Sequence, residues 1–505
     1  MSTDQKVALV GAGVAGLYTA LALSRRGFEV DVYERDVPPP AGDADQAFFN
    51  WQRRGAAQFR HPHAFLGLMC STLEANYPDL LDEIFATGAR RVDFKDMVPP
   101  GLLPDYRPEP GDEELWVLMC RRATMETVLR SYVARQPGIN INNTTYVTGV
   151  HTERDGPTDP LRVTGLELTD RANHNQRSTL NPDLVVDATG RASKFRQWLQ
   201  LQGATIPERN EDAEIVYYTR HYRLHPGIEE PNRHEHEPFA GDLGYMKYGV
   251  FPGEDGHFAV IICVPNHETE LRAAIKTPAH FDAICMQIPG LRPWLDSSQS
   301  SATTPSFGIG DIHAVWRDFV RDEQPELLNY FAVGDAAVRT NPLYGRGCST
   351  GILHAHLLAE VLTEHSEPEA RALAFHTITH ERMRPIWDAS LNEDQNGIKR
   401  ANAVLNGQPL NQADTLKKWF GLAFGDALAA CVREEIHVFR GTMRTVNLVE
   451  KPGHFLKDPK IRRTVFRYML RGRKRNAKAR VQRGPERLEM LKFVADLESP
   501  IASAG

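Results

Sequence analysis

Three glycines near the N-terminus have the spacing of a loop that binds the phosphates of a dinucleotide. Gly11, Gly13 and Gly16 form a G-x-G-x-x-G motif, and Glu34 follows it. The first glycine permits a tight turn, the second lets the backbone approach the pyrophosphate, and the third lets the next helix pack closely. A carboxylate about 20 residues further on accepts the ribose hydroxyls, and it would repel a 2′-phosphate, which argues against NADP.

The residues around this motif predict the strand, turn and helix that such a site needs. Residues 6–10 are an apolar run typical of a buried parallel strand, and residues 17–26 have a helical pattern. Gly27 stands where a left-handed residue closes a helix, and residues 30–33 suit a second strand. The cofactor-binding residues predicted here are Gly11, Gly13, Ala15, Gly16, Glu34 and Arg35.

Two later segments distinguish FAD from NAD, which share the first motif. Residues 183–196 read DLVVDATGRASKFR, and residues 331–337 read FAVGDAA and are followed by NPLYGRGCS at 341–349. Together the three segments resemble the FAD-dependent monooxygenase superfamily typified by p-hydroxybenzoate hydroxylase. The resemblance implies that Asp335, after Gly334, holds the FAD ribitol. It also implies a loop beside the isoalloxazine, shaped by Pro342, Gly345 and Gly347 and followed by Cys348.

Elementary physics is consistent with these implied roles. An apolar strand would deliver Asp335 at its carboxyl end, and a helix starting near Gly347 would direct its positive end at the flavin edge that gains charge on reduction. Asp335 as a simple helix cap is the alternative. The resemblance also suggests Arg122, which starts a helix, and Arg60 as FAD contacts. His61 and His63 are either donors to flavin or substrate, or ordinary loop histidines.

One departure from the family concerns the reductant. The family's middle motif carries Asp-Gly, where this chain has Thr189-Gly190. In the family that Asp helps to organise FAD and incoming NAD(P)H, and this chain has no second G-x-G-x-x-G. The pattern is closer to the two-component epoxidase and halogenase-like branches, although the Trp-x-Trp-x-Ile-Pro segment of tryptophan-type halogenases is absent. A separate flavin reductase is therefore an expected partner.

The spacing of the motifs predicts an α/β fold with a discontinuous Rossmann-type FAD-binding domain, formed by residues 1–204 and 316–370. Residues 205–315 contain alternating apolar strands and a Gly253–Gly256 turn, which predict an inserted antiparallel β-sheet substrate domain. Residues 371–505 are predicted to form a helical C-terminal region. Five aromatic side chains of the insertion either line the substrate pocket or fill the sheet core: Tyr217, Tyr218, Tyr245, Tyr248 and Phe251.

Composition indicates a globular protein in a reducing compartment. The 505 residues are 41% hydrophobic and 25% charged with a net charge of −6, which gives no reason to expect nucleic acid as a partner. The six cysteines form no C-x-x-C pair, and the N-terminus lacks a signal-peptide pattern, so we expect a cytoplasmic protein. His376 and His380 are four apart, but without an H-E-x-x-H arrangement no metal site is predicted.

Residues 451–483 contain thirteen Lys or Arg and one acid, Asp458. Ile461, Val465, Tyr468 and Met469 recur within this basic segment at helical spacing, as in an amphipathic helix. Three interpretations remain open. The helix docks on the acidic remainder of the chain, contacts an anionic membrane peripherally, or binds the acidic surface of a partner protein.

The resemblance implies an FAD-dependent monooxygenase that adds one oxygen atom to an apolar or electron-rich small molecule by epoxidation or hydroxylation. In that chemistry reduced flavin and O2 form a C4a-hydroperoxide, and the protein positions it and excludes water. Tyr344, Arg346 and His63 are the candidate catalytic residues, with structural roles as the alternative. The rival functions are desaturation, double-bond reduction or halogenation on the same scaffold, and a non-catalytic FAD-binding scaffold.

Overall fold

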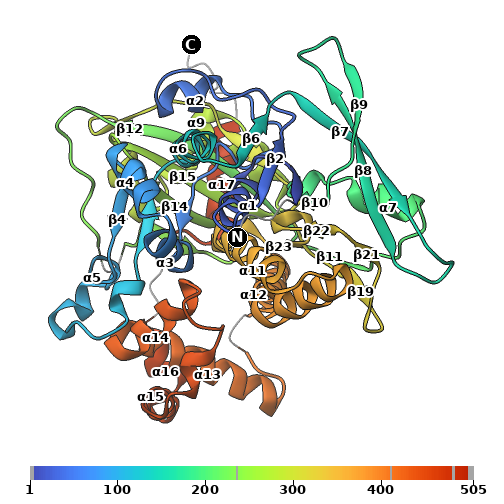
Figure 1. The fold of residues 1–505 in the computed structure, drawn as a ribbon. Helices are drawn as coiled ribbons and strands as arrows, with labels where there is room; N and C mark the ends of the chain where they lie inside the picture. The colour runs from blue at the N-terminus through green and yellow to red at the C-terminus, as the bar shows by residue number, and fades with distance from the viewer. Residues whose placement is uncertain (1–4, 235–236, 410–411, 480–483, 499–505) are drawn as a thin grey trace.

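A parallel β-sheet forms the centre of the nucleotide-binding half of the molecule (Figure 1). The computed structural model describes residues 5–234, 237–409, 412–479 and 484–498. The sheet has the strand order β22-β10-β1-β2-β6. Its strands are β1 (Lys6–Val10), β2 (Glu29–Tyr33), β6 (Ile139–Asn142), β10 (Leu184–Asp187) and β22 (Tyr330–Ala332).

Apolar residues fill both faces of this sheet, as expected for parallel strands. One face packs against α1 (Val14–Ser24), α3 (Gly67–Asn76), α4 (Pro78–Ala86), α6 (Arg122–Ala134) and α11 (Gly347–Glu364). The other face packs against β7 (Thr145–Glu153), β8 (Leu161–Asp170), α7 (Phe195–Leu201) and α12 (Pro368–Leu405). Burial on both faces explains why these strands read as continuous apolar runs.

The register of the parallel strands brings the three sequence motifs to one edge of the sheet. Val10 pairs with Asp187, and Asp187 pairs with Ala332. The chain leaves each of these strands at its carboxyl end, which is where ligands bind in open α/β sheets. Residues separated by more than 300 positions in the chain therefore meet at a single site.

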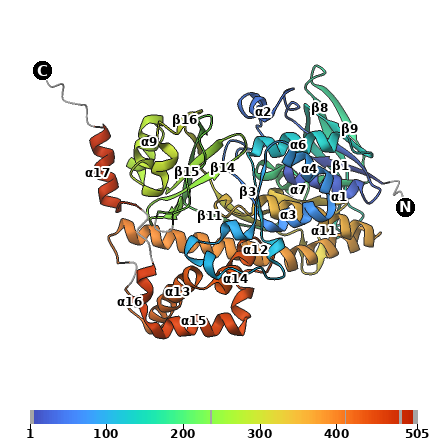
Figure 2. The same ribbon diagram turned by 90° about the vertical axis from the view of Figure 1, so that its left-hand side faces the viewer.

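A second, antiparallel sheet has the strand order β13-β14-β15-β12-β16, with β17 also paired to β12. Its strands are β12 (Ile215–Leu224), β13 (Ala240–Asp242), β14 (Lys247–Pro252), β15 (His257–Pro265), β16 (Ser300–Ala302) and β17 (Phe307–Ile309). Its outer face packs against α8 (Thr269–Ile275), α9 (Pro278–Cys285) and α17 (Arg487–Glu498) (Figure 2). The antiparallel sheet predicted within 205–315 is therefore present.

Helices make up the rest of the C-terminal region. α12 is followed by α13 (Leu416–Glu434), α14 (Ile436–Val446), α15 (Pro459–Arg471) and α16 (Arg473–Asn476). Within the described residues, no helix is long and apolar enough to cross a membrane.

The basic helix α15 docks on neighbouring helices. Ile461, Val465 and Tyr468 are buried in one cluster with Ala427, Ala430, Cys431 and Val438 of α13 and α14. Its arginines meet acidic groups there, because Arg467 pairs with Glu435 and Arg471 with Glu434, and Arg473 of the following α16 pairs with Asp426. These contacts favour the docked interpretation of the basic segment, of which residues 480–483 lie outside the described residues.

Candidate active site

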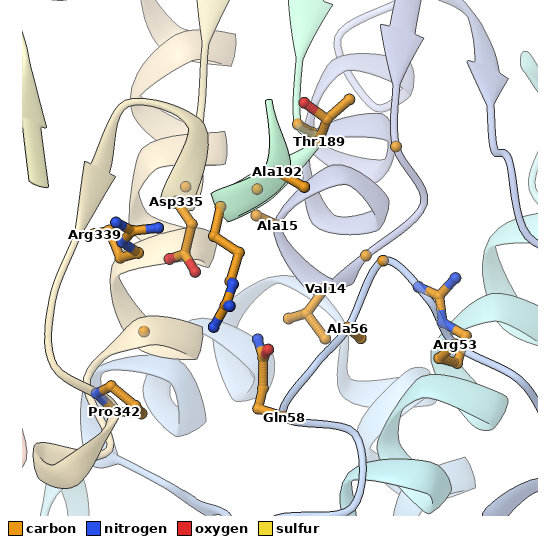
Figure 3. A pocket seen from close by; sticks show the side chains of 18 of the residues that line it. Val14, Ala15, Arg53, Ala56, Gln58, Thr189, Ala192, Asp335, Arg339 and Pro342 are labelled. Atoms are coloured by element: carbon orange, nitrogen blue, oxygen red, sulfur yellow. The ribbon is translucent and has the colours of Figure 1, made fainter. Parts of the chain in front are cut away.

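The carboxyl edge of the parallel sheet opens into a cavity of about 730 Å³. Its walls come from both sheets and from the loops between them. Figure 3 shows Arg53 at one end and Asp335, Arg339 and Pro342 at the other. Of the predicted site residues, those that line the cavity are Gly11, Gly13, Ala15, Glu34, Arg35, His63, Arg122, Gly334, Asp335, Pro342, Tyr344, Gly345, Gly347 and Cys348.

The glycines fit the steric roles that their spacing predicts. Gly11 has a φ of +103°, which favours glycine, and a Cβ on Gly16 would lie 2.0 Å from the carbonyl oxygen of Gly11. A Cβ on Gly13, Gly190 or Gly347 would meet nothing within 4 Å. Because all three line the cavity, their backbone is open to close approach by a ligand.

Glu34 lies at the carboxyl end of β2 and organises the glycine turn. One carboxylate oxygen accepts the N–H of Ala12 at 2.8 Å, and the other accepts the N–H of Asp36 at 2.9 Å. Each oxygen retains capacity for a further hydrogen bond, as from a ribose hydroxyl. The side chain also lies 3.3 Å from Arg53, a residue that no sequence motif had indicated.

Arg53 is the centre of a buried ion-pair cluster beneath the cavity. It pairs with Asp36 at 3.0 Å and with Glu126 at 2.9 Å, and Glu126 also pairs with Arg122 at 2.5 Å. Burial alone would raise the pKa of the Glu126 carboxyl, but the charges of Arg122 and Arg53 outweigh burial and lower the pKa below its ordinary value. The cluster therefore stays ionised and fixes Arg122 at the cavity wall.

His63 is held as a neutral imidazole. Its Nδ1 contacts the carbonyl oxygen of His61 at 2.9 Å, and its Nε2 contacts Arg122 at 3.3 Å. A carbonyl only accepts and a guanidinium only donates, so Nδ1 carries the proton and Nε2 accepts. Burial and the charge of Arg122 lower the pKa of His63 to about 3. His61, with a pKa lowered to about 4 by burial, contacts Thr219 at 2.8 Å.

Asp335 lies at the cavity without a hydrogen-bond or ion-pair partner among the described residues. Burial raises the pKa of its carboxyl, while the charges of Arg339, Arg122 and Arg191 oppose the increase. The preceding turn is held from behind, because the N–H of Gly334 donates to Nδ1 of the buried His354 at 3.2 Å. An acceptor so placed fits the hydroxyl-rich ribitol of FAD.

The cavity therefore fits FAD on two independent observations. Glycine backbone is open at three places along its wall, and a carboxylate without a partner stands at the far end from Glu34. Pyrophosphate needs the first feature and a polyhydroxyl chain needs the second. These residues could hold the cofactor along the whole cavity.

The turn that carries Thr189-Gly190, where the family has Asp-Gly, is held together by the carboxylate of Asp187. Asp187, two residues earlier, accepts hydrogen bonds from the N–H of Thr189 at 2.9 Å and from its hydroxyl at 2.5 Å. Ser193 and Tyr330 donate to the same carboxylate. Asp187 thus shapes this turn from within, and its buried carboxylate is occupied by the loop itself.

The second sheet closes the far end of the cavity with apolar side chains. Tyr217, Phe251, Ile261 and Ile309 of this sheet line it there, together with Leu343 of the 342–344 turn. Tyr218, Tyr245 and Tyr248, also proposed for the pocket, do not line this cavity. They are buried in the sheet's outer core with Tyr222 and Phe258.

A hydrogen-bonded group stands beside this apolar wall. The hydroxyl of Tyr217 donates to Asn341, whose amide donates to Asp394 of α12 at 2.6 Å. Tyr344 donates to the same carboxylate oxygen at 2.9 Å, while the other oxygen of Asp394 is buried without a partner. Burial raises the pKa of Asp394 to about 6, although the hydrogen bonds from Asn341 and Tyr344 oppose it.

Three predicted site residues do not line the cavity. Gly16 lies inside α1, where it allows close packing. Arg60 donates to the carbonyl oxygens of Phe48 and Phe49, and Arg346 donates to Ser390 at 2.6 Å and Glu393 at 2.9 Å. Sequence reasoning missed several polar lining residues, among them Arg53, Gln58, Arg191 and Arg339. Only their nearness in sequence to the motifs could have pointed to them.

Comparisons with known proteins agree with this geometry. The model of the FAD dependent oxidoreductase family matches residues 6–365. The kynurenine 3-monooxygenase of Aspergillus terreus (strain NIH 2624 / FGSC A1156) is 24% identical over 409 residues, which cover 76% of this chain and 75% of that protein.

Two solved structures show the same fold. The flavin-dependent brominase Bmp2 superposes with a TM-score of 0.60 at 14% identity, over 93% of this chain and 100% of its own. The p-nitrophenol 4-monooxygenase PnpA from Pseudomonas putida DLL-E4 has a TM-score of 0.53 at 17% identity, over 90% and 100%.

Proposed function

This chain belongs to the FAD dependent oxidoreductase family, and we propose that it inserts one oxygen atom into an apolar, electron-rich organic molecule. The predicted fold class, the FAD cofactor and the FAD-dependent monooxygenase class are confirmed. The substrate, the residues that act on it and the domain boundaries remain proposals. We assign residues 1–204 and 316–370 to FAD binding, 205–315 to substrate binding, and 371–505 to the helical region.

The observation that carries the proposal is the continuity of the cavity. Gly13, Glu34, Asp335, Tyr217 and Phe251 all line one space. An FAD held by the first three residues would have its reactive ring at the apolar wall formed by the last two. A substrate there would be bound by apolar contact and shielded from water.

Bound FAD supplies the activation of O2 in this class of enzyme. The chain supplies positioning and a dry chamber. We assign Gly11, Gly13, Glu34, Arg35 and Arg122 to the nucleotide and Gly334, Asp335, Pro342, Gly345, Gly347 and Cys348 to the ribitol and ring. Because Arg346 is bound to α12, we assign it to holding the loop rather than to contact with substrate.

Tyr344 and Asp394 are proposed to move a proton between the chamber and its surroundings. Tyr344 lines the large cavity, and both residues line an adjoining cavity of about 30 Å³. The Tyr344 hydroxyl donates to Asp394, whose pKa of about 6 lets the carboxyl exchange a proton near neutral pH. Because its pKa is about 3, His63 is a neutral imidazole near neutral pH and has no imidazolium proton to donate, so its proposed role is to orient Arg122.

The names of the relatives suggest the substrate class. The proteins compared above are named for kynurenine and for p-nitrophenol, both aromatic compounds. An aromatic ring would pack against Tyr217 and Phe251 at the wall of the chamber. We therefore propose an aromatic or comparably electron-rich substrate.

The reaction can be tested by supplying the purified flavoprotein with chemically reduced flavin, isotopically labelled O2 and a panel of aromatic compounds. Incorporation of one labelled oxygen atom into a product is the expected result. Steady oxygen consumption that gives only hydrogen peroxide with every compound would count against the proposed reaction on this panel. Failure to bind any flavin would overturn the FAD assignment itself.

We also propose a separate flavin reductase as the source of electrons. The turn that holds Thr189 is satisfied internally by Asp187, so no free carboxylate stands where the family's Asp would help with NAD(P)H. Anaerobic mixing with NADH or NADPH is expected to leave the flavin oxidised until a reductase is added. Rapid bleaching by either nucleotide alone would disprove this.

Halogenation is the main competing reaction, because the brominase Bmp2 has a similar fold. A halogenase needs an amine near the substrate to relay hypohalous acid. Lys194 is the one lysine among the described residues that line the cavity, and it belongs to the 188–198 segment rather than to the second sheet. This arrangement favours oxygenation.

Peripheral membrane contact is proposed for the exposed side of the basic helix. Phe466 and Leu470 of α15 are 60% and 74% exposed between arginines, a pattern suited to an anionic lipid surface. Serine at both positions should reduce co-sedimentation with anionic vesicles. Leu201→Ser, at an 80% exposed leucine on α7, is the control, and equal binding by the double variant would reject the contact.

A further inference from the structure

Two histidines of α12 and an aspartate from another part of the chain form a compact group outside the lining of the large cavity. His376 and His380 are one turn apart on α12, and Asp318 directly follows β18 (His313–Arg317). One potential ligand atom from each of the three lies within 4.8 Å of the others. The sequence spacing of the histidines alone could not show that a carboxylate completes the group.

The contacts within the group are only partly explained by ordinary structure. Nε2 of His380 lies 2.8 Å from Asp318, and the same carboxylate oxygen accepts the indole N–H of Trp316 at 2.8 Å. These bonds tie α12 to the end of β18. His376 takes no part in them and has no hydrogen-bond partner among the described residues, although its ring centroid is only 4.2 Å from that of His380.

The donor chemistry is that of a zinc site. Two imidazole nitrogens and one carboxylate oxygen are preferred zinc ligands, with bonds of about 2.0–2.2 Å and a solvent molecule in the fourth position. In a tetrahedral site the ligand atoms are roughly 3.3 Å apart, so the observed group needs side-chain shifts of about 1 Å. All three residues are half-buried, which gives an ion access from solvent.

The electrostatic surroundings permit a cation. Arg384, about one turn after His380 on α12, is engaged by Asp388 at 2.9 Å and lies over the rings of Trp316 and Trp387. Among the described residues no Lys or Arg pairs with Asp318, whose carboxylate contacts only His380 and the indole of Trp316, so it is open to a cation. A metal ion binds such a group with the imidazoles neutral and the carboxylate ionised.

We propose that Asp318, His376 and His380 bind a zinc ion that ties α12 to the strand behind the cofactor loop. Trp316 and Val338 pair between β18 and β23 (Val338–Arg339), and β23 follows the Gly334–Asp335 turn. None of the three ligands lines the large cavity, so the ion has a structural role rather than a catalytic one. This site is independent of the proposed monooxygenase reaction.

The test uses the tag-free FAD-loaded protein, dialysed against a chelator and titrated with zinc chloride by calorimetry. The wild-type chain is expected to bind one zinc ion saturably, with a rise in its thermal unfolding midpoint. His376→Ala should weaken binding by roughly 100-fold, since one of three protein ligands is lost. It should leave the midpoint in chelator unchanged, because His376 makes no hydrogen bond.

Matched variants separate this site from the other histidines of the chain. Asp318→Asn should also lose zinc binding, and the fraction of FAD bound in chelator reports whether it is folded. Glu381→Gln, beside His380 on α12, and His151→Ala, on β7, should bind zinc as the wild type does. Absence of saturable binding at micromolar zinc, or undiminished binding by His376→Ala, would overturn the proposal.

Discussion

The two ends of the large cavity are built in different ways. The nucleotide end is made of glycine backbone and of ion pairs such as Arg53–Glu126, whose side chains are each 1% exposed. The substrate end is made of apolar side chains on strands, with Asp394 and Tyr344 beside them. The nucleotide end requires a defined position of the backbone itself. The substrate end requires only that apolar side chains face the cavity.

This difference separates what is common to flavin enzymes from what makes each of them specific. A phosphate on glycine N–H groups tolerates almost no displacement of the backbone. An apolar pocket accepts substitutions that conserve volume at a cost of about 1.5 kcal/mol or less. Changes at the nucleotide end should therefore abolish flavin binding or folding, whereas changes at the substrate end should alter specificity and pH response.

The largest effect is expected at Gly16. A Cβ there would lie 2.0 Å from the carbonyl oxygen of Gly11, so Gly16→Ala should destabilise the fold by about 4 kcal/mol or more. Thermal unfolding and soluble yield measure this loss. Gly13→Ala is the matched variant, because its Cβ meets nothing within 4 Å. It should fold normally and bind FAD poorly, and equal behaviour of the two variants would contradict the assigned roles.

Asp335→Asn should lower FAD affinity by roughly 10- to 100-fold, since a charge-assisted acceptor for the ribitol is lost. The variant should be at least as stable as the wild type without flavin, because it removes a buried carboxylate that lacks a partner. Fluorescence titration of the apoprotein with FAD measures the first effect. A loss of apoprotein stability instead would show that Asp335 is a structural residue.

At the substrate end, Asp394 should make stability depend on pH. Its ordinary pKa is 3.8 and its folded value is about 6, so the folded chain retains the proton longer than the unfolded chain. The resulting stabilisation, about 3 kcal/mol at most, is fully present below the ordinary pKa and lost as pH rises through about 6. Denaturant unfolding at several pH values should show this slope in the wild type and a flatter one in Asp394→Asn.

The smallest effect is expected for Phe251→Ala on the apolar wall. It should weaken the binding of an aromatic substrate by about 1–2 kcal/mol and so raise KM. The affinity for FAD should be unchanged. Tyr218→Phe is the control, because Tyr218 lies on the second sheet but does not line the cavity. A larger loss of FAD affinity than of substrate affinity would mean that the two ends are not separate.

The same contrast explains what could be predicted from the sequence. The nucleotide end is encoded in short runs, since residues 6–16 already specify strand, turn and helix, and β1, β10 and β22 are each recognisable as an apolar run before a motif. Arg60 was predicted at the cofactor, but its guanidinium donates to Phe48 and Phe49, and Arg53 lies there instead. Arg53 and Arg60 are seven residues apart in an irregular loop, where no periodic pattern indicates which arginine faces the cofactor.

Side chains at the substrate end depend on contacts between distant segments. Asp394 is one acidic residue among many in a long helical run, and only folding brings it to Asn341 and Tyr344. Tyr217 and Tyr218 are adjacent in β12 and point to opposite faces, so the strand pattern selects both equally. Which of the two faces the cavity depends on how the sheet packs against the rest of the chain.

The 38-residue helix α12 contacts both the loop beside the cofactor cavity and the second sheet (Figure 2). Its Trp387 donates to the backbone of Arg339, Asp394 joins Asn341, and Arg400 pairs with Asp242 of the second sheet. A rigid rotation of one sheet away from the other would therefore have to flex this helix. Pro385 lacks an amide hydrogen in the helix interior, so the helix lacks one backbone hydrogen bond there and would bend most readily at that position.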